Sequence, residues 1–175
     1  AIAGGFLTNA FNAFHIPTLE REALIALYSA TDGDNWTNNT GWNGAAGTEC
    51  DWYGVTCASG ATLDTGAVTL GGITILSLGR NNLNGSIPAE LGNLTSLTSL
   101  DLSWDNQLSG SIPPELGNLT SLTYLSLYDN NLTGSIPPEL GNLINLTYLS
   151  LRNNQLSGSI PTELGNLTSL TSLHL

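Results

Sequence analysis

The chain has 175 residues and a formal net charge of −11, because fourteen Asp and Glu residues stand against three arginines and no lysine. This balance excludes the usual electrostatic attraction to nucleic acid and to anionic membrane surfaces. Charged residues make up only 10% of the chain, so it is not a disordered acidic tail. No apolar run approaches the roughly 18 residues that a membrane span needs.

Residues 1–17, AIAGGFLTNAFNAFHIP, are mildly apolar and follow no clean period. We expect an N-terminal extension that is either the remnant of a leader or a strand or helix packed on the segment that follows. Methionine is absent from the whole chain. Its absence is expected if a signal peptide has been removed, and equally if the start has been trimmed.

Residues 18–70 form a block that is expected to begin with one amphipathic helix ending near Gly33. Thr18 is the expected N-cap, and Glu20 and Glu22 lie where the helix dipole favours acids. The apolar residues at helical spacing are Leu19, Ala23, Leu24, Leu27 and Tyr28.

Aromatic residues and cysteines follow this helix in a segment rich in Gly and Asn. Three tryptophans in so short a segment indicate a small core rather than a ligand site: Trp36, Trp42 and Trp52. Cys50 and Cys57 are predicted to form a short-loop disulfide, which implies an oxidising compartment. A reduced pair is an alternative. Half of a zinc site is another, but His15 and His174 lie far away in the sequence.

Residues 71–175 repeat one segment almost unchanged. Its copies include NLNGSIPAELGNL, QLSGSIPPELGNL, NLTGSIPPELGNL and QLSGSIPTELGNL. Four successive units begin at Leu91, Leu116, Leu140 and Leu164, at spacings of 25, 24 and 24 residues. Near-identical segments at fixed spacing indicate one structural unit stacked on copies of itself. We therefore expect about four full units and a partial last one.

Within a unit, the pattern LxxLxLxxNxL predicts a short strand whose leucines point inward. In the third unit these are Leu122, Leu125 and Leu127, which sends Tyr124 and Tyr128 to the opposite face. Inward asparagines are expected to satisfy buried backbone groups of adjacent coils: Asn81, Asn106, Asn130 and Asn154. The glycine after each strand permits a bend, and Ile-Pro then leads into a tight helical turn.

This pattern resembles the plant-specific class of leucine-rich repeats, LxxLxLxxNxLxGxIPxxLGxLxx, over about residues 70–175. The preceding segment resembles the N-terminal cap of that family through Trp42, Cys50, Trp52, Gly54, Val55 and Cys57. Residues 21–42 are most similar to the caps of bacterial and algal relatives. The resemblance implies an α/β solenoid with three features. They are a right-handed leucine-rich-repeat superhelix with a helical N-terminal cap, a concave parallel β-sheet, and convex 3-10 turns with a second small strand. It also implies a recognition surface on the concave side.

Outward positions of the predicted strands differ between units, whereas the inward positions are nearly constant. The candidate ligand-binding residues on this face are Tyr124, Tyr128, Tyr148, Arg152, Asp101 and Trp104. Aromatic residues beside arginine are typical of binding hot spots, and Trp104 lies where the extra residue of the long unit predicts a bulge. We expect a protein or polysaccharide ligand here. The alternative is a solvated face on which tyrosines pack across strands.

Catalysis is not expected, and neither is a cofactor or a metal. A nucleophile needs a base close by, and the two histidines lie far apart in the sequence. One carboxylate per unit recurs at the first turn of each short helix, where the dipole favours an exposed acid: Glu90, Glu115, Glu139 and Glu163.

Three further expectations concern alternative functions, location and assembly. Ice binding is an alternative function, because a stiff solenoid can present a regular row of hydroxyls: Thr98, Thr123, Thr147 and Thr171. Inhibition of microbial wall-degrading enzymes is another alternative function.

We expect a secreted or cell-surface protein. The final strand carries no polar cap, so we expect either a piece of a longer protein or a homodimer through Leu170, Leu173 and Leu175.

Overall fold

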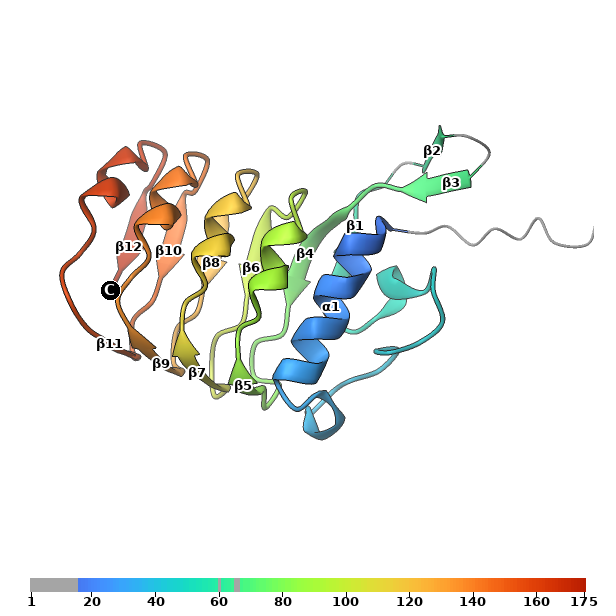
Figure 1. Ribbon diagram of the computed structural model, residues 1–175, viewed down its shortest axis with the longest axis horizontal. Coiled ribbons are helices and arrows are strands. Elements are labelled where there is room, and N and C mark those ends of the chain that lie inside the picture. The colour runs from blue at the N-terminus through green and yellow to red at the C-terminus, as the bar shows by residue number, and fades with distance from the viewer. Residues whose placement is uncertain (1–15, 60, 65–66) are drawn as a thin grey trace, which may run out of the picture.

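The computed structural model describes residues 16–59, 61–64 and 67–175. They form a row of coils stacked side by side, with one α-helix at the N-terminal end of the row (Figure 1). The strands of the larger sheet lie on one side of the row and short 3-10 helices on the other, so the predicted α/β solenoid is confirmed. The predicted extension, residues 1–17, lies outside the described residues apart from its last two.

The larger sheet has six strands in the order β1-β4-β6-β8-β10-β12. Neighbouring strands are parallel, except that β1 pairs antiparallel with β4. The strands are β1 (Val55–Cys57), β4 (Ile73–Ser77), β6 (Ser99–Asp101), β8 (Tyr124–Ser126), β10 (Tyr148–Ser150) and β12 (Ser172–His174). The outward face of this sheet is called the concave face below.

A second parallel sheet has the order β11-β9-β7-β5. Its strands are β5 (Asn84–Ser86), β7 (Gln107–Ser111), β9 (Asn131–Gly134) and β11 (Gln155–Leu156). The 3-10 helices of the coils are η3 (Ala89–Asn93), η4 (Pro114–Asn118), η5 (Pro138–Asn142) and η6 (Thr162–Asn166). Both the second strand and the tight turn after Ile-Pro are therefore where the repeat predicted them.

The cap contributes the remaining elements. They are α1 (Thr18–Ala30), η1 (Gly33–Asn35), η2 (Glu49–Asp51) and an antiparallel hairpin of β2 (Ala61–Asp64) and β3 (Ala67–Leu70). None of the helices in the described part of the chain has the length and apolar character that a bilayer span requires.

One continuous apolar core runs from the cap through the coils. The inward leucines of the third unit are completely buried, as predicted, and so are those of its neighbours. Each buried leucine contributes about 1.5–3 kcal/mol relative to an exposed one. A single coil could not bury these side chains, so stability arises between coils. At the far end, Leu173 and Leu175 are 46% and 43% exposed, and the expected self-association through this edge stays a prediction.

The inward asparagines bond to the backbone of neighbouring coils. The side-chain oxygen of Asn130 accepts the Leu108 N–H at 3.0 Å, and its amide donates to the Leu102 carbonyl at 2.9 Å. Asn106 and Asn154 make equivalent bonds to the coils that precede them. Asn81 makes its bonds to the cap instead, accepting the Asn38 N–H at 2.7 Å and donating to the Asn38 carbonyl at 2.9 Å. The predicted role of these residues is confirmed, since each bond satisfies backbone groups whose loss would cost about 1–3 kcal/mol.

The start of α1 corrects one prediction. Pro17, rather than Thr18, occupies the N-cap position, and no side chain caps the helix. Leu19 is 58% exposed instead of buried. Glu20 lies in the first turn as predicted, but it is buried and accepts the Ile73 N–H at 2.7 Å. The reason is tertiary: the first N–H of β4 needs an acceptor, and Glu20 supplies it.

The helix also ends at Ala30, slightly before the predicted Gly33. The Thr31 hydroxyl donates back to the Leu27 carbonyl at 2.7 Å, and Asp32 adopts a left-handed φ of 58°. This backbone reversal stops the helix.

The interior of the cap is aromatic, as predicted. Trp36, Trp42 and Trp52 are buried, with ring centroids 4.7 Å apart in the first pair and 5.1 Å apart in the second. A disulfide joins Cys50 and Cys57, whose Cα atoms are 5.6 Å apart. The tryptophans therefore form a small core of their own, continuous with the leucines of the array.

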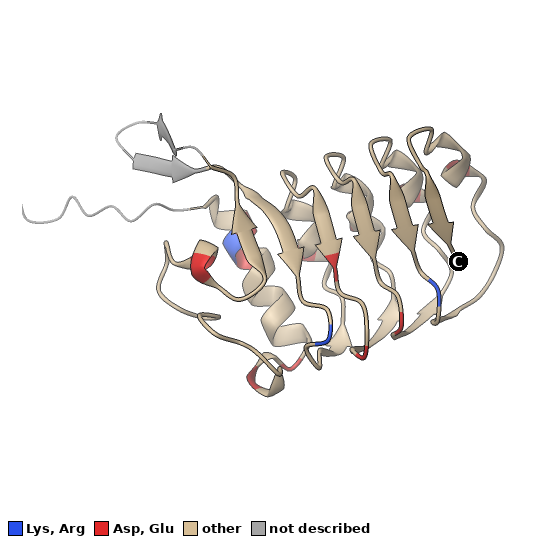
Figure 2. Cartoon of the chain, turned by 180° about the vertical axis from the view of Figure 1, so that it is seen from behind, with Lys and Arg blue, Asp and Glu red and all other residues tan. Residues whose placement is uncertain are grey.

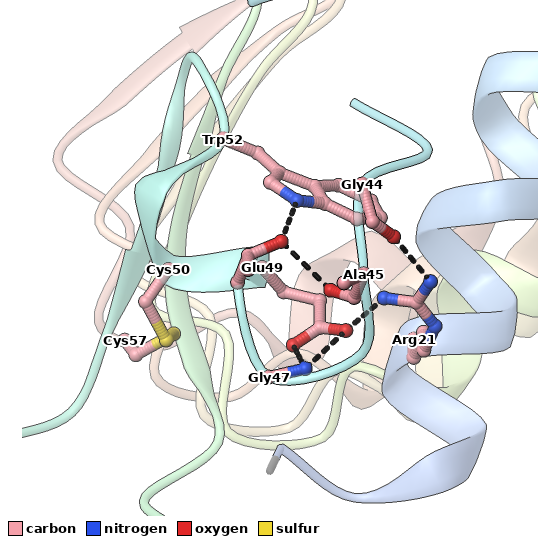
Figure 3. Close-up of polar contacts among 9 residues, drawn as sticks. Arg21, Gly44, Ala45, Gly47, Glu49, Cys50, Trp52 and Cys57 are labelled. Atoms are coloured by element: carbon pink, nitrogen blue, oxygen red, sulfur yellow. Dashed lines mark hydrogen bonds and ion pairs between the residues drawn. A yellow bond between two sulfur atoms is a disulfide. The ribbon is translucent and has the colours of Figure 1, made fainter. Parts of the chain in front are cut away.

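One ion pair ties α1 to Glu49, the first residue of η2 (Figure 3). Arg21 pairs with the buried carboxylate of Glu49 and donates to the Gly44 carbonyl at 2.8 Å. Glu49 also accepts the Gly47 N–H at 3.0 Å, and the guanidinium lies 5.3 Å from the centre of the Trp52 ring. Arg21 is thus fully engaged in holding the cap together.

Candidate binding site on the concave face

The register of the six-stranded sheet brings the predicted residues together. Tyr124 is directly opposite Tyr148, and Asp101 is opposite Ser126. Tyr124 and Tyr148 project outward and are partly exposed rather than tucked among the leucines. Ser126 and Ser150 of the next column are buried, even though they point to the same side as the tyrosines. The face is therefore a packed surface and not a set of isolated side chains.

Tyr124 and Tyr148 form a stacked pair, with ring centroids 4.7 Å apart and planes 7° from parallel. The ring of His174 lies 5.6 Å from Tyr148 at 49°. Burial raises the pKa of the Tyr124 hydroxyl, and the negative charge of Asp101 adds to the effect. The phenol therefore stays a neutral hydrogen-bond donor.

A second group crosses four coils at the end of the strands. It is called the cation–aromatic row and consists of Arg80, Trp104, Tyr128 and Arg152. The Arg80 guanidinium lies 4.7 Å from the Trp104 ring centre, and the Trp104 and Tyr128 rings meet edge to face at 4.7 Å. Arg152 lies 5.7 Å from the Tyr128 ring centre. Each member touches the next.

Trp104 reaches this row because its coil contains one extra residue. Trp104 and Asp105 both adopt left-handed φ values, 62° and 50°, whereas the next coil has only Asp129 at 60°. The Arg80 N–H is shared between the carbonyls of Ser103 and Trp104, at 3.1 and 3.0 Å. The predicted bulge is present, and it leaves the Trp104 side chain 43% exposed.

Sequence reasoning missed two residues of the site, Arg80 and His174. Arg80 could have been found, because it directly precedes the inward Asn81, just as the pair Trp104-Asp105 directly precedes the inward Asn106 of the next unit. His174 belongs to the same column as Asp101 but was not singled out. No pattern in one sequence predicts that its ring meets Tyr148.

A hollow of ≈ 340 Å³ lies between the two groups, lined by Trp104, Tyr128, Tyr148, Ser150, Arg152 and His174. None of these residues carries a carboxylate. Asp101 lies nearby, but its carboxylate accepts the Ser103 N–H at 3.0 Å and the Ser103 hydroxyl. The hollow offers aromatic surface, hydroxyls and one guanidinium. Such a surface is suited to contact rather than to bond making.

The other candidate rows lie away from this hollow. The glutamates of the four units are exposed at the first turn of η3 to η6, as predicted. In the described residues, no three His, Cys, Asp or Glu side chains gather where they could hold a metal ion. The threonines form a ladder: each hydroxyl donates to a threonine carbonyl of the preceding coil at 2.9 Å. That ladder consists of Thr98, Thr123, Thr147 and Thr171.

The chain belongs to the leucine-rich repeat family. Residues 17–58 match the family described as "Leucine rich repeat N-terminal domain". Residues 95–142 match "Leucine Rich repeats (2 copies)", and residues 72–94 and 145–167 match "Leucine Rich Repeat".

Solved structures agree with this assignment. The BIR2 ectodomain from Arabidopsis thaliana is 34% identical, with a TM-score of 0.72, and the match covers 87% of this chain and 77% of that one. The ectodomain of the receptor kinase GASSHO1/SCHENGEN3 from Arabidopsis thaliana, in complex with CASPARIAN STRIP INTEGRITY FACTOR 2, is 37% identical. Its TM-score is 0.75, and the match covers 87% of this chain and 17% of that one. A plant ice-binding protein is 27% identical, with a TM-score of 0.55, and the match covers 92% of this chain and 56% of that one. The bacterial or algal character of the cap stays a prediction.

Proposed function

We propose that this chain is an extracellular recognition module that binds a protein or peptide through its concave face. One observation carries the proposal. Units that are nearly identical elsewhere differ on this face, where their variable residues form a stacked tyrosine pair and a connected row of arginines and aromatic rings. Tyrosine, tryptophan and arginine are the residues from which binding hot spots are built.

Two further observations support this proposal. The similar GASSHO1/SCHENGEN3 ectodomain was solved in complex with CASPARIAN STRIP INTEGRITY FACTOR 2, although this chain spans only 17% of that ectodomain. The disulfide in the cap is typical of proteins in oxidising compartments. Both favour a location outside the cell. Inhibition of a microbial wall-degrading enzyme would be one form of this activity.

The ring geometry favours a protein or peptide over a polysaccharide. A sugar needs the free face of an aromatic ring, but Tyr124 and Tyr148 turn one face toward each other at 4.7 Å. Arg152 and Arg80 lie over the rings of Tyr128 and Trp104. The contacts leave hydroxyls and guanidinium groups available to a ligand beside the rings, and these suit peptide groups and side chains.

Catalysis is not part of the proposal. His174 is the only histidine among the described residues, and within them it makes no hydrogen bond to an acid. Ser150 lies opposite His174 on the neighbouring strand, but a general base with no orienting acid is a poor start for covalent chemistry.

The test is a binding screen against extracellular proteins, peptides and glycans, repeated with three variants. Tyr124→Ala, Tyr148→Ala and Arg152→Ala should each weaken binding of the true ligand by about tenfold or more, as expected for hot-spot residues. Glu139→Gln on the opposite side is the matched control and should bind normally. Unchanged affinity of all three variants for every ligand found would contradict the proposal. A ligand set made up of glycans alone would correct its chemical class.

A second candidate function is ice binding. The threonine ladder repeats once per coil with constant bond lengths, and one similar solved structure is that of a plant ice-binding protein. Regular hydroxyl rows on a stiff scaffold favour this function, and measurements of ice growth test it.

A further inference from the structure

The arginines of this acidic protein are used in two different ways. Arg21 pairs with Glu49 inside the cap. Arg80 and Arg152 make no ion pair within the described residues, although the chain has fourteen Asp and Glu residues. Arg80 follows β4 and Arg152 follows β10. Figure 2 shows two blue segments just beyond the ends of strands in the six-stranded sheet, with acidic red segments between them. Two such cations on a chain of net charge −11 require an explanation.

Aromatic rings, rather than acids, hold these two guanidinium groups. Arg80 lies over Trp104 and Arg152 over Tyr128, at 4.7 and 5.7 Å from the ring centres. A guanidinium held over a ring keeps its N–H donors available at its rim. Within the described residues Arg80 donates no side-chain hydrogen bond, and Arg152 donates only a long one of 3.4 Å to Asn153. Both guanidinium groups can therefore donate hydrogen bonds to a carboxylate of a ligand.

The nearby acids are directed elsewhere. The Asp101 carboxylate is engaged by Ser103. Asp105 and Asp129 line a separate hollow with Asn106, Gln107, Asn130 and Asn131, whereas the hollow beside Arg152 is lined without a carboxylate. An anion paired with Arg152 would therefore lie beside a hollow that no carboxylate lines.

The spacing of the row defines what would fit. Arg80, Trp104, Tyr128 and Arg152 follow the strands β4, β6, β8 and β10, so three strand-to-strand steps separate the two arginines. At about 4.8 Å per step this is about 14 Å, and an extended peptide advances about 3.3 Å per residue, or about 13 Å in four residues. Alternate residues of such a peptide point to the same side.

We propose that the cation–aromatic row binds an extended acidic peptide segment of the form acid-x-apolar-x-acid, lying across the strands. The first and last side chains would each pair with one arginine, and the middle one would rest against the paired rings of Trp104 and Tyr128. This inference rests on the proposed function and names its ligand chemistry. The same spacing disfavours acids that are adjacent or only two residues apart, because such a pair reaches only one arginine.

The experiment uses three synthetic peptides and calorimetry. The first contains Asp-Ser-Leu-Ser-Asp, the second is its isomer Asp-Asp-Leu-Ser-Ser, and the third replaces both acids by Asn. We expect the first peptide to bind about tenfold more tightly than the other two, and added salt to weaken its binding. Arg80→Gln and Arg152→Gln should each remove about tenfold of that affinity, while Glu139→Gln should leave it unchanged.

The outcomes separate this inference from the function on which it rests. Equal affinity for the two isomers, or unchanged affinity in both arginine variants, would overturn the acid-pair proposal. No binding of the first peptide at millimolar concentration would overturn it as well. In each case the proposed function survives if a ligand found in the screen is lost on Tyr124→Ala and Tyr148→Ala. If those variants also bind every ligand normally, both proposals fail together.

Discussion

Glu20 shows how a single side chain can join a cap to a repeat array. Its carboxylate leaves the surface of α1, so that only 4% of the residue stays exposed, and accepts the first N–H of β4 at 2.7 Å. Burial raises the pKa of this carboxyl group, and the hydrogen bond from Ile73 opposes the rise to a smaller extent. The contact therefore satisfies the Ile73 N–H, but at neutral pH burial of the carboxylate charge destabilises the folded protein.

We expect Glu20→Gln to stabilise the protein at neutral pH, because glutamine keeps an acceptor for Ile73 and carries no charge. A raised folded-state pKa means that the glutamate's contribution is fully present below the unfolded value, about 4.5, and is lost as the pH rises through the folded value. The variant's gain should therefore be larger at pH 7 than at pH 4. Urea denaturation at both pH values measures the free energies of unfolding.

Glu22→Gln is the matched control, since Glu22 belongs to the same helix and is not buried. It should change the pH dependence of stability little. If the free energy of unfolding depended on pH identically in Glu20→Gln and in the unmodified protein, ionisation of the buried carboxyl group would not be destabilising the folded state.

At the scale of elements, the stacking of the short helices depends on glycine in the repeated Leu-Gly-Asn. A Cβ placed on Gly117 would lie 2.4 Å from the Glu139 carbonyl oxygen of the next coil, and Gly92 and Gly141 meet the same kind of contact. Gly165 of the last unit has nothing within 4 Å. The same glycine is therefore required where another coil follows and unconstrained where none lies against it.

We predict that Gly117→Ala destabilises the protein by about 1–3 kcal/mol, the usual cost of overpacking. Gly165→Ala has the same local sequence without the contact, so it should be neutral or slightly stabilising through the unfolded chain. Thermal and urea unfolding of both variants checks this. Equal effects of the two substitutions would mean that local backbone preference, not packing between coils, selects the glycine.

At the scale of the whole molecule, the sequence was most informative where the fold is most repetitive. Inward leucines and asparagines recur with fixed spacing, so one unit predicted the strands, the turns and the continuous core. The cap was only partly predictable. Its helix was found, but the burial of Glu20 was not predicted, because its hydrogen-bond partner Ile73 lies in another element. The residues of the candidate face were found by column, yet Arg80 was missed because its place in the row depends on contact with Trp104 of the next coil.

The two candidate functions place different demands on the molecule as a whole. Ice binding needs a flat, regular surface with free hydroxyl groups, but each threonine hydroxyl of the ladder already donates its hydrogen to the coil before it. The row is also one residue wide and is flanked by the tyrosines of the concave face. Recognition needs only one variable patch, and that patch is present.

We therefore expect no thermal hysteresis and no inhibition of ice recrystallisation at high micromolar protein. The measurement should include a Thr123→Lys, Thr147→Lys double variant, whose long charged side chains would interrupt the ladder, and Glu139→Gln as a control that leaves it intact. Hysteresis that the lysine substitutions abolish and the control retains would contradict this expectation. If Tyr124→Ala and Tyr148→Ala also left ice growth inhibition unchanged, the function would belong to the threonine row.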